Sequence, residues 1–350
     1  MKPLITCGVH TYSAGMTLTY QQFKEIRDAC YKTECIIKNS NPWKKTTRLY
    51  CYAYLEQGVK VFLSGKSGKL YRLRIQIEPC RVLGLEDPTV LFQPNKRQYK
   101  EMVKAVDKML KKLVIPASID SMKISRCDLT LNSAFSSQSE LREYLRIFQK
   151  SLVIPHYKHV FFKKNDQKVK DYKAANAHSH CISCKSANFL IYDKIAQVEM
   201  IDRYDETLLN KHILRFEAEL KRETLKKHLG KTALGTNWGL LSAAAKQSSK
   251  IVRWYLKRLQ PECDSYLRYG DAVKLIEATD LKKKTEERML YLLRKASDKE
   301  SLTAALESMR KEFDFSKSQC NNVLKKFRNL GISPITLPNS SNFDELRPLI

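Results

Sequence analysis

Period-two alternation of apolar and polar residues is the feature that most constrains how this chain can fold. Leu73, Ile75 and Ile77 alternate with charged or polar neighbours, which predicts a strand with one buried face and one polar face. The same period recurs in the runs 122–133 and 214–221. Because amphipathic stretches separate these runs, the sequence predicts an α+β fold rather than an all-β one.

The remaining patterns divide the chain into two predicted domains. We expect an α+β domain with antiparallel strands over residues 1–235 and a helical region over 236–350. Thr19 is a candidate cap for the first helix. Other expected elements are strands over 4–12, paired strands over 50–65 and 69–84, helices over 19–32, 100–114 and 136–152, a hairpin over 180–194, helices over 237–259 and 282–296, and a helix-turn-helix over 301–332.

Charge and composition limit the partners. The 350 residues include 63 Lys and Arg against 37 Asp and Glu, a net charge of +26, and such a field attracts polyanions. Nucleic acid is favoured over membrane, because no window approaches eighteen consecutive apolar residues. Polar residues interrupt the N-terminal stretch too early for a signal peptide, so we expect a soluble, cytoplasmic protein. The ten cysteines are scattered, which favours reduced thiols.

One cysteine and histidine cluster could suggest zinc. The segment HSHCISC places four residues of zinc-binding types within seven positions: His178, His180, Cys181 and Cys184. Zinc sites normally draw on two separated pairs of ligands, whereas these four would have to fold back on one another. A polar loop that leads into a hairpin is the favoured interpretation.

Ionisable groups lie on the polar faces of three predicted strands. Asp128 shares a strand face with Arg126, Tyr192 lies in the hairpin, and Glu217 and Glu219 share one face of a third strand. Hard carboxylate oxygens suit Mg²⁺ or Mn²⁺, and such an ion would polarise a phosphodiester. A tyrosine nearby could attack phosphorus and remain covalently attached, with Lys194 favouring its phenolate.

Several segments resemble one known family. SRCDLTLNS, ANFLIYDKIAQVEM and LRFEAELKRETLKKHL are similar to the three main blocks of the replication initiators of filamentous phages, the gene II and gene X protein family. GVKVFLSG and IQIEPCRVLG resemble a fourth, upstream block. The similarity covers roughly residues 50 to 235, and all blocks occur in the same order.

The resemblance implies an endonuclease for rolling-circle DNA replication with a nuclease domain of the initiator type. Tyr192 falls on the nucleophile of the family, and Asp128 and Glu217 fall on its acidic positions. Lys194 and Glu199 match polar positions, whereas Glu219 stands where relatives can carry a basic residue. The implied metal ligands are Asp128, Glu217, Glu219 and Glu199, and the implied ion is Mg²⁺ or Mn²⁺.

The resemblance also implies partners and a mechanism. Tyr192 would leave a 5′-phosphotyrosyl link and a 3′-hydroxyl primer, and the displaced strand would later be rejoined. The partners would be origin DNA, both supercoiled duplex and displaced single strand, with a host helicase and polymerase in the cytoplasm of a bacterium. Expected DNA contacts are Arg126, Arg215, Lys221, Lys317, Lys325 and Arg328.

The histidines depart from the wider class of rolling-circle initiators. That class usually presents two histidines that flank an apolar residue, and this chain contains no such triplet. Either carboxylates dominate the metal site, or a histidine such as His156, His159 or His180 joins them from elsewhere in the sequence.

Two other functions stay open. A non-catalytic DNA-binding regulator would account for the net charge and the predicted helical pair. It would not explain why acidic residues lie on the polar faces of the strands. A tyrosine recombinase is suggested by the run 212–215, HILR, with Tyr255 downstream. That motif belongs on a helix, whereas Arg215 opens an alternating, strand-like run.

Overall fold

The structure is a computed structural model, and it describes residues 5–32, 37–39, 48–56, 58–66, 70–162, 168–169, 178–200 and 206–349. The chain divides into two compact units, and each is built from separate stretches of sequence. The carboxylate unit comprises 5–132 and 217–251, and the tyrosine unit comprises 1–4, 133–216 and 252–350. Neither unit ends at residue 235, where the sequence suggests a boundary.

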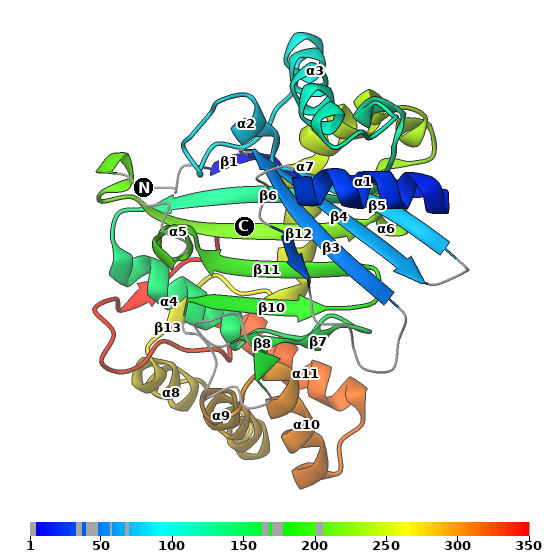
Figure 1. Cartoon of the computed structure of the whole chain (residues 1–350). Helices are drawn as coiled ribbons and strands as arrows, with labels where there is room; N and C mark the ends of the chain where they lie inside the picture. Colours follow the sequence, from blue (N-terminus) through cyan, green and yellow to red (C-terminus); the bar gives the residue numbers. More distant parts are fainter. Residues whose placement is uncertain are drawn as a thin grey trace. The chain divides into compact units, whose positions relative to one another are not determined.

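Antiparallel strands form the centre of the carboxylate unit (Figure 1). The antiparallel pairs are β2 with β3, β3 with β4, β4 with β5, and β5 with β1. The strands lie in the order β2 (Ile37–Asn39), β3 (Arg48–Glu56), β4 (Val59–Lys66), β5 (Leu70–Ile77), β1 (Ile5–Leu18), β6 (Lys123–Phe135) and β12 (His212–Lys221). The predicted α+β class with antiparallel strands is therefore confirmed.

The alternation in the sequence corresponds to the observed faces. Leu73, Ile75 and Ile77 are at most 2% exposed, as predicted. The stretch 50–65 differs from expectation, because it contains two strands rather than one. Gly58 lies where β3 gives way to β4 and has a φ of 85°, a conformation that glycine adopts without strain.

Helices flank these strands within the carboxylate unit. The α-helices are α1 (Tyr20–Lys32), α2 (Pro79–Val82), α3 (Lys96–Lys112), α6 (Arg222–Leu229) and the first part of α7 (Asn237–Leu259), with short 3-10 turns at 119–121 and 232–234. The backbone N–H of Gln22 donates to the Thr19 hydroxyl at 3.2 Å, which confirms the predicted cap. Phe23 and Ile26 of α1 are buried.

The tyrosine unit contains the predicted hairpin. Strand β10 (Ser179–Ser183) pairs antiparallel with β11 (Ala187–Asp193). Phe148 packs edge-on against Phe216 at 5.3 Å between ring centroids. Neighbouring elements are α4 (Gln138–Gln149), β7 (Lys158–His159), β8 (Phe161–Phe162), β9 (Lys168–Val169), α5 (Lys194–Met200) and a 3-10 turn at 206–208. Most of the polar, lysine-rich run 163–180 lies outside the described residues.

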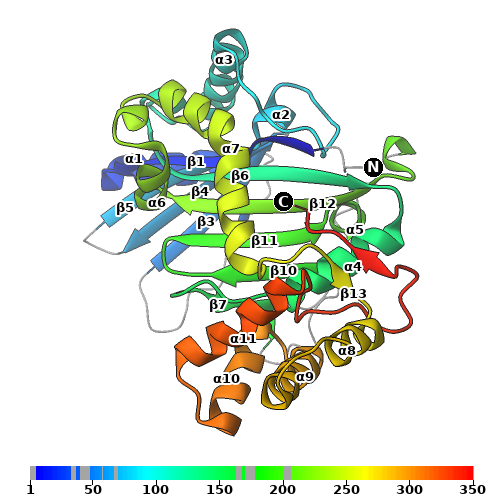
Figure 2. The same ribbon diagram turned by 180° about the vertical axis from the view of Figure 1, so that it is seen from behind.

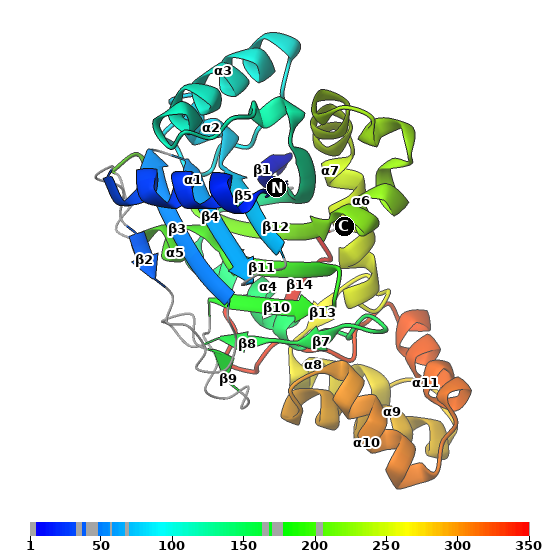
Figure 3. The ribbon, with the colours of Figure 1, turned by 45° about the vertical axis from the view of Figure 1, so that its right-hand side comes forward.

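The C-terminal part of the tyrosine unit is helical, as predicted. A group of four helices is visible in Figure 3: α8 (Tyr269–Glu277), α9 (Lys283–Asp298), α10 (Leu302–Phe313) and α11 (Lys317–Asn329). The final stretch returns to pair β14 (Glu345–Leu346) with β13 (Tyr266–Leu267). Between α10 and α11, Asp314 is left-handed with φ 50°, and Ser316 begins a capping box with Gln319.

The capping box at the start of α11 generates a stability prediction. Ser316→Ala removes the oxygen that accepts from the Gln319 backbone N–H at 3.3 Å, so the free energy of unfolding should fall by about 1 kcal/mol. Urea denaturation followed by circular dichroism measures the change. Ser318→Ala, at an exposed position two residues into the same helix, is the control and should leave the urea midpoint unchanged.

Candidate metal centre

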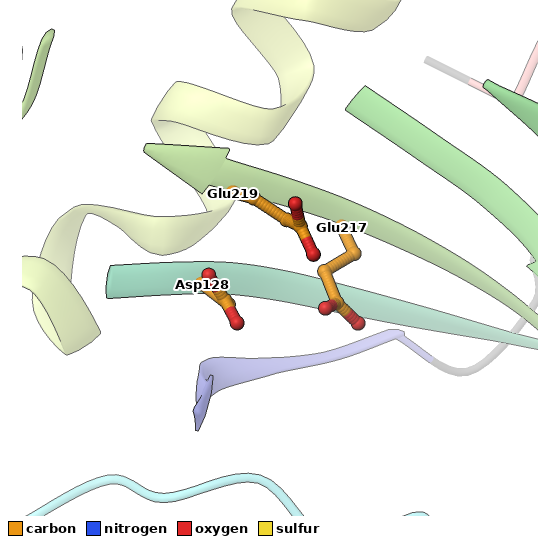
Figure 4. Close-up of side chains that lie close together, drawn as sticks. All are labelled: Asp128, Glu217 and Glu219. Atoms are coloured by element: carbon orange, nitrogen blue, oxygen red, sulfur yellow. The ribbon is translucent and has the colours of Figure 1, made fainter. Parts of the chain in front are cut away.

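Three carboxylates gather within the carboxylate unit. Asp128 comes from β6, and Glu217 and Glu219 come from the neighbouring strand β12. One oxygen of each lies within 4.8 Å of the others, and Figure 4 shows the three side chains close together, with Asp128 on one strand and both glutamates on the other. Asp128 is completely buried and Glu217 is 6% exposed. Among the described residues, this is the only group of three metal-ligating side chains.

The period of strand β12 explains why both glutamates reach the same place. Phe216, Ala218 and Leu220 are buried on one face, so Glu217 and Glu219 lie together on the other. On β6, Asp128 lies on the face that it shares with Arg126, as the sequence predicts. The structure adds the order of the strands, which brings the two polar faces next to each other.

Arg126 provides positive charge to the cluster. Its Nε donates to Asp128 Oδ1 at 2.6 Å and its Nη2 donates to Asp128 Oδ2 at 2.6 Å, a bidentate arrangement. The same Nη2 lies 2.6 Å from Glu219 Oε1. Burial opposes the charge of Arg126, but the hydrogen bond and charge of Asp128, together with both glutamates, raise its pKa. Arg126 therefore stays protonated and links two of the three carboxylates.

The environment of Asp128 resists a negative charge. Burial raises the pKa of Asp128 to about 8, Arg126 opposes the rise, and Glu217 and Glu219 add to it. Several carboxylates that share a buried space need protons or cations to balance them. Hard oxygen donors of this kind suit Mg²⁺ or Mn²⁺, so the donor set fits the ion that the sequence suggests.

His10 of β1 is the histidine beside the cluster. Its Nδ1 lies 3.3 Å from Glu217 Oε2 and 3.3 Å from the Thr11 hydroxyl. His156, His159 and His180 were the candidates from the sequence, and His10 was not predicted. The local sequence shows only that His10 lies in a strand-like run. Its proximity to the cluster could not be inferred, because β6, its neighbour in the sheet, is more than a hundred residues away in sequence. His10 could serve as a nitrogen ligand or as a partner that orients Glu217.

Tyr192 lies in the other unit, on β11. It is half-buried on the strand face of Asn188 and Leu190, and it pairs in register with Ser179 of β10. The three carboxylates thus come together without residues of the tyrosine unit. Within that unit, β11 is the neighbour of the first residues of β12, 212–216.

The residues that follow Tyr192 start helix α5. The Asp193 carboxylate accepts from the backbone N–H groups of Ile195 and Ala196 at 3.1 Å, which is a helix cap. Gln138 donates to the same carboxylate at 2.6 Å. Lys194 is 4% exposed, and its Nζ donates to Gln197 at 2.8 Å. Asp193 therefore has a structural role that the strand pattern alone did not reveal.

The other predicted site residues are spread over both units. Glu199 is exposed on α5, outside the carboxylate cluster. Arg215 of β12 is fully buried, so a contact with DNA would require its exposure. Lys221, Lys317, Lys325 and Arg328 are exposed, and Arg328 forms an ion pair with Glu262.

The structure also places the residues of the alternative interpretations. The run HILR lies on strand β12 rather than on a helix, and Tyr255 is 1% exposed on α7, stacked on Phe189. His180 and Cys181 are buried in the hairpin. They belong to no group of three metal-ligating side chains among the residues that the structure describes.

No protein-family model matches the chain, and no curated protein matches it either. No described helix is long and apolar enough to cross a membrane.

The cluster predicts selective loss of metal binding. Asp128→Asn and Glu217→Gln should each lower the affinity for Mn²⁺ roughly ten-fold or more, since each removes a charged oxygen donor. Titration calorimetry with Mn²⁺ alone measures the affinity. Glu199→Gln is the matched control, because Glu199 lies outside the cluster; an equal loss in that variant would contradict this assignment of ligands.

His180 predicts a pH dependence of stability. Burial, and then His159, lower the pKa of His180 to about 3. The unfolded chain, in which the pKa is about 6.5, therefore binds the proton more readily. Stability is retained above pH 6.5 and falls as the pH drops below it, by about 2 kcal/mol at pH 5.

Urea unfolding at pH 7 and pH 5 measures that loss. His180→Phe should reduce the difference between the two pH values by about 2 kcal/mol. His156→Asn, which changes an exposed histidine with a positive φ of 69°, should leave the difference as it is in the unmodified protein.

Proposed function

We propose that the protein is a metal-dependent initiator of rolling-circle DNA replication that nicks and rejoins one strand through a phosphotyrosyl intermediate. The observation that carries the proposal is the buried cluster of Asp128, Glu217 and Glu219, with one oxygen of each within 4.8 Å of the others. Three carboxylates brought together by two neighbouring strands have the donor chemistry for Mg²⁺ or Mn²⁺. The net charge of +26 supports a polyanionic substrate.

The carboxylates and Arg126 have distinct parts in this proposal. Asp128 and Glu217, with Glu219, hold the ion, and His10 orients Glu217 or joins the ligands. The bound ion supplies Lewis acidity to a phosphodiester oxygen. Arg126 already forms short hydrogen bonds with two carboxylates, so it is positioned to balance charge around the scissile phosphate.

Tyr192 is the proposed nucleophile. Its Oη forms a bond to phosphorus, the bond from phosphorus to the 3′ oxygen breaks, and the tyrosine proton passes to solvent while the leaving oxygen takes one up. The products are a 5′-phosphotyrosyl link and a 3′-hydroxyl, and attack by a 3′-hydroxyl reverses the step without ATP. The pairing of β11 with its neighbours holds Tyr192 on a regular strand, which suits a group that must be presented repeatedly in one orientation.

The proposed partners follow from the reaction. The substrate is the supercoiled duplex at an origin, the displaced single strand is rejoined, and a host helicase and polymerase extend the primer in the bacterial cytoplasm. The exposed residues Lys317 and Lys325 on α11 are candidates for contacts with the phosphate backbone.

Covalent capture tests the proposal. The probe is a supercoiled plasmid that carries the replication origin of the genome encoding this chain, incubated with protein and Mg²⁺ and analysed on a denaturing gel. The unmodified protein should yield nicked circles with an adduct that peptide mapping assigns to Tyr192. Tyr192→Phe should abolish the adduct and change plasmid affinity less than two-fold, because only the hydroxyl is lost.

The controls separate this function from its alternatives. Tyr31→Phe changes an exposed tyrosine of α1 and should nick normally. Asp128→Asn should slow nicking by at least about a hundred-fold if it weakens the metal site. Salt-sensitive binding to the plasmid without any adduct, in protein saturated with Mg²⁺, would instead identify a DNA-binding regulator.

A further inference from the structure

Helix α3 of the carboxylate unit carries a row of exposed lysines. These lysines recur at intervals of four or three positions, and they are Lys96, Lys100, Lys104, Lys108 and Lys111. Side chains three or four residues apart on a helix lie on the same face. We call these five lysines the lysine ridge. At a rise of about 1.5 Å per residue, the ridge extends over about 22 Å.

The opposite face of α3 holds the helix in the unit. Met102, Val106 and Leu110 are completely buried. Tyr99 packs against Trp238 at the start of α7, with 5.3 Å between ring centroids. In the front view and in the view from behind, α3 forms an outer edge of the carboxylate unit (Figure 1 and Figure 2). The lysine ridge therefore lies on a well-anchored helix and faces solvent.

No acidic side chain neutralises the lysine ridge. Within the part of the chain that the structure describes, none of the five lysines forms an ion pair. The two acidic residues of α3 have other partners. Glu101 accepts a hydrogen bond from Arg97 at 2.9 Å. Asp107 accepts from the Ser118 hydroxyl at 2.6 Å and from the Ile119 backbone N–H at 2.8 Å. The charge of the ridge is thus available to an external anion.

The charges of the lysine ridge oppose the stability of the helix itself. The first turn of α3 contains Lys96 and Arg97 and no acidic residue, although the helix dipole favours negative charge there. The lysines at 96, 100, 104 and 108 also repel one another, because like charges four residues apart are neighbours on a helix. A helix surface that only meets water normally mixes both signs of charge. A single sign that weakens the helix is typical of a surface that serves a function.

The chemistry of the helix indicates the class of partner. A helix that binds a membrane inserts an apolar face into the lipid, whereas Met102, Val106 and Leu110 are in the core. Single-stranded nucleic acid is bound by cations together with aromatic rings, and Tyr99, the one aromatic residue of α3, is 5% exposed. Lysines spaced about 6 Å apart match the phosphates on the outside of a duplex, because contacts with phosphate need charge but no flat or apolar surface.

We propose that the lysine ridge binds the phosphate backbone of double-stranded DNA without reading its sequence. Each lysine that approaches a phosphate releases a condensed counterion, so the ridge supplies affinity. Contacts with phosphate also orient the protein on the duplex, but they carry no base specificity. The ridge is distinct from Lys317 and Lys325, which belong to the tyrosine unit. The choice of DNA as the source of the phosphates rests on the proposed function.

Fluorescence anisotropy with the full-length protein and a labelled duplex of about 25 base pairs tests the ridge. The triple variant Lys100→Gln, Lys104→Gln and Lys108→Gln should bind the duplex at least about ten-fold more weakly at about 0.1 M salt. The slope of log affinity against log salt should become shallower by about 2 to 3, because three phosphate contacts are lost. Two duplexes of unrelated sequence should show the same loss.

A matched control removes the same net charge elsewhere. The triple variant Lys282→Gln, Lys283→Gln and Lys284→Gln changes exposed lysines at the start of α9 and should weaken binding less than about two-fold. Equal losses in the two triple variants would overturn the proposal, because they would show that only the net charge of the protein matters.

Conservative replacements separate the charge of the ridge from the folding of α3. The triple variant Lys100→Arg, Lys104→Arg and Lys108→Arg keeps the three charges and should bind like the unmodified protein. Equal losses in the arginine and glutamine variants would contradict the proposal. The glutamine variant should also melt no lower than the unmodified protein, since it relieves repulsion between lysines. A lower melting temperature with normal binding of the duplex would assign the ridge to the fold instead.

Lipid vesicles test the other class of partner. The unmodified protein and the glutamine variant of α3 should sediment in equal amounts with vesicles of phosphatidylserine and phosphatidylcholine. A loss on vesicles without a loss on the duplex would overturn the proposal and identify an anionic membrane as the partner.

The nicking assay keeps this proposal separate from the proposed function. If no adduct forms but binding of the duplex depends on the three lysines, the lysine ridge stands and the nicking function fails. If the adduct forms on Tyr192 but the glutamine variant of α3 binds the duplex normally, the lysine ridge fails and the nicking function stands.

Discussion

The bidentate contact between Arg126 and Asp128 is the interaction on which the candidate site depends. A buried carboxylate costs a large desolvation free energy unless charge and hydrogen bonds compensate it. Arg126 supplies both, and its Nη2 reaches Glu219 as well. The guanidinium therefore lets strands β6 and β12 place their acidic residues side by side. Without that positive charge, burial of Asp128 beside Glu217 and Glu219 would oppose the pairing of these strands.

Much of the local structure followed from the sequence, because period-two alternation is a direct consequence of strand geometry. It predicted the buried face of β5 and the shared face of Glu217 and Glu219. The order of the strands could not be predicted in the same way, since it depends on contacts between residues far apart in sequence. The adjacency of His10 to Glu217 follows only from that order, which explains why the histidine was missed.

The burial of charged residues was the second property that could not be predicted from the sequence. Arg215 lies on the same strand face as Glu217, and its charge favoured an exposed position, but the residue is completely buried. When both faces of a strand are buried, the residue types on one face do not show whether that face lies inside the protein. Asp193 shows another limit: the strand pattern assigned it no role, whereas its carboxylate caps α5. Short polar residues favour helix starts for this reason.

The discontinuity of the two units has a consequence for biosynthesis. The carboxylate unit contains β1 near the N-terminus and also needs residues 217–251, so a ribosome must complete most of the chain before this unit can close. Pairings of such long sequence separation form slowly, because the loop between them must be ordered first. Strands β3 to β5 are synthesised early, so their sheet stays incomplete until the later residues are made. Unpaired strand edges in this state favour association with chaperones or with other nascent chains.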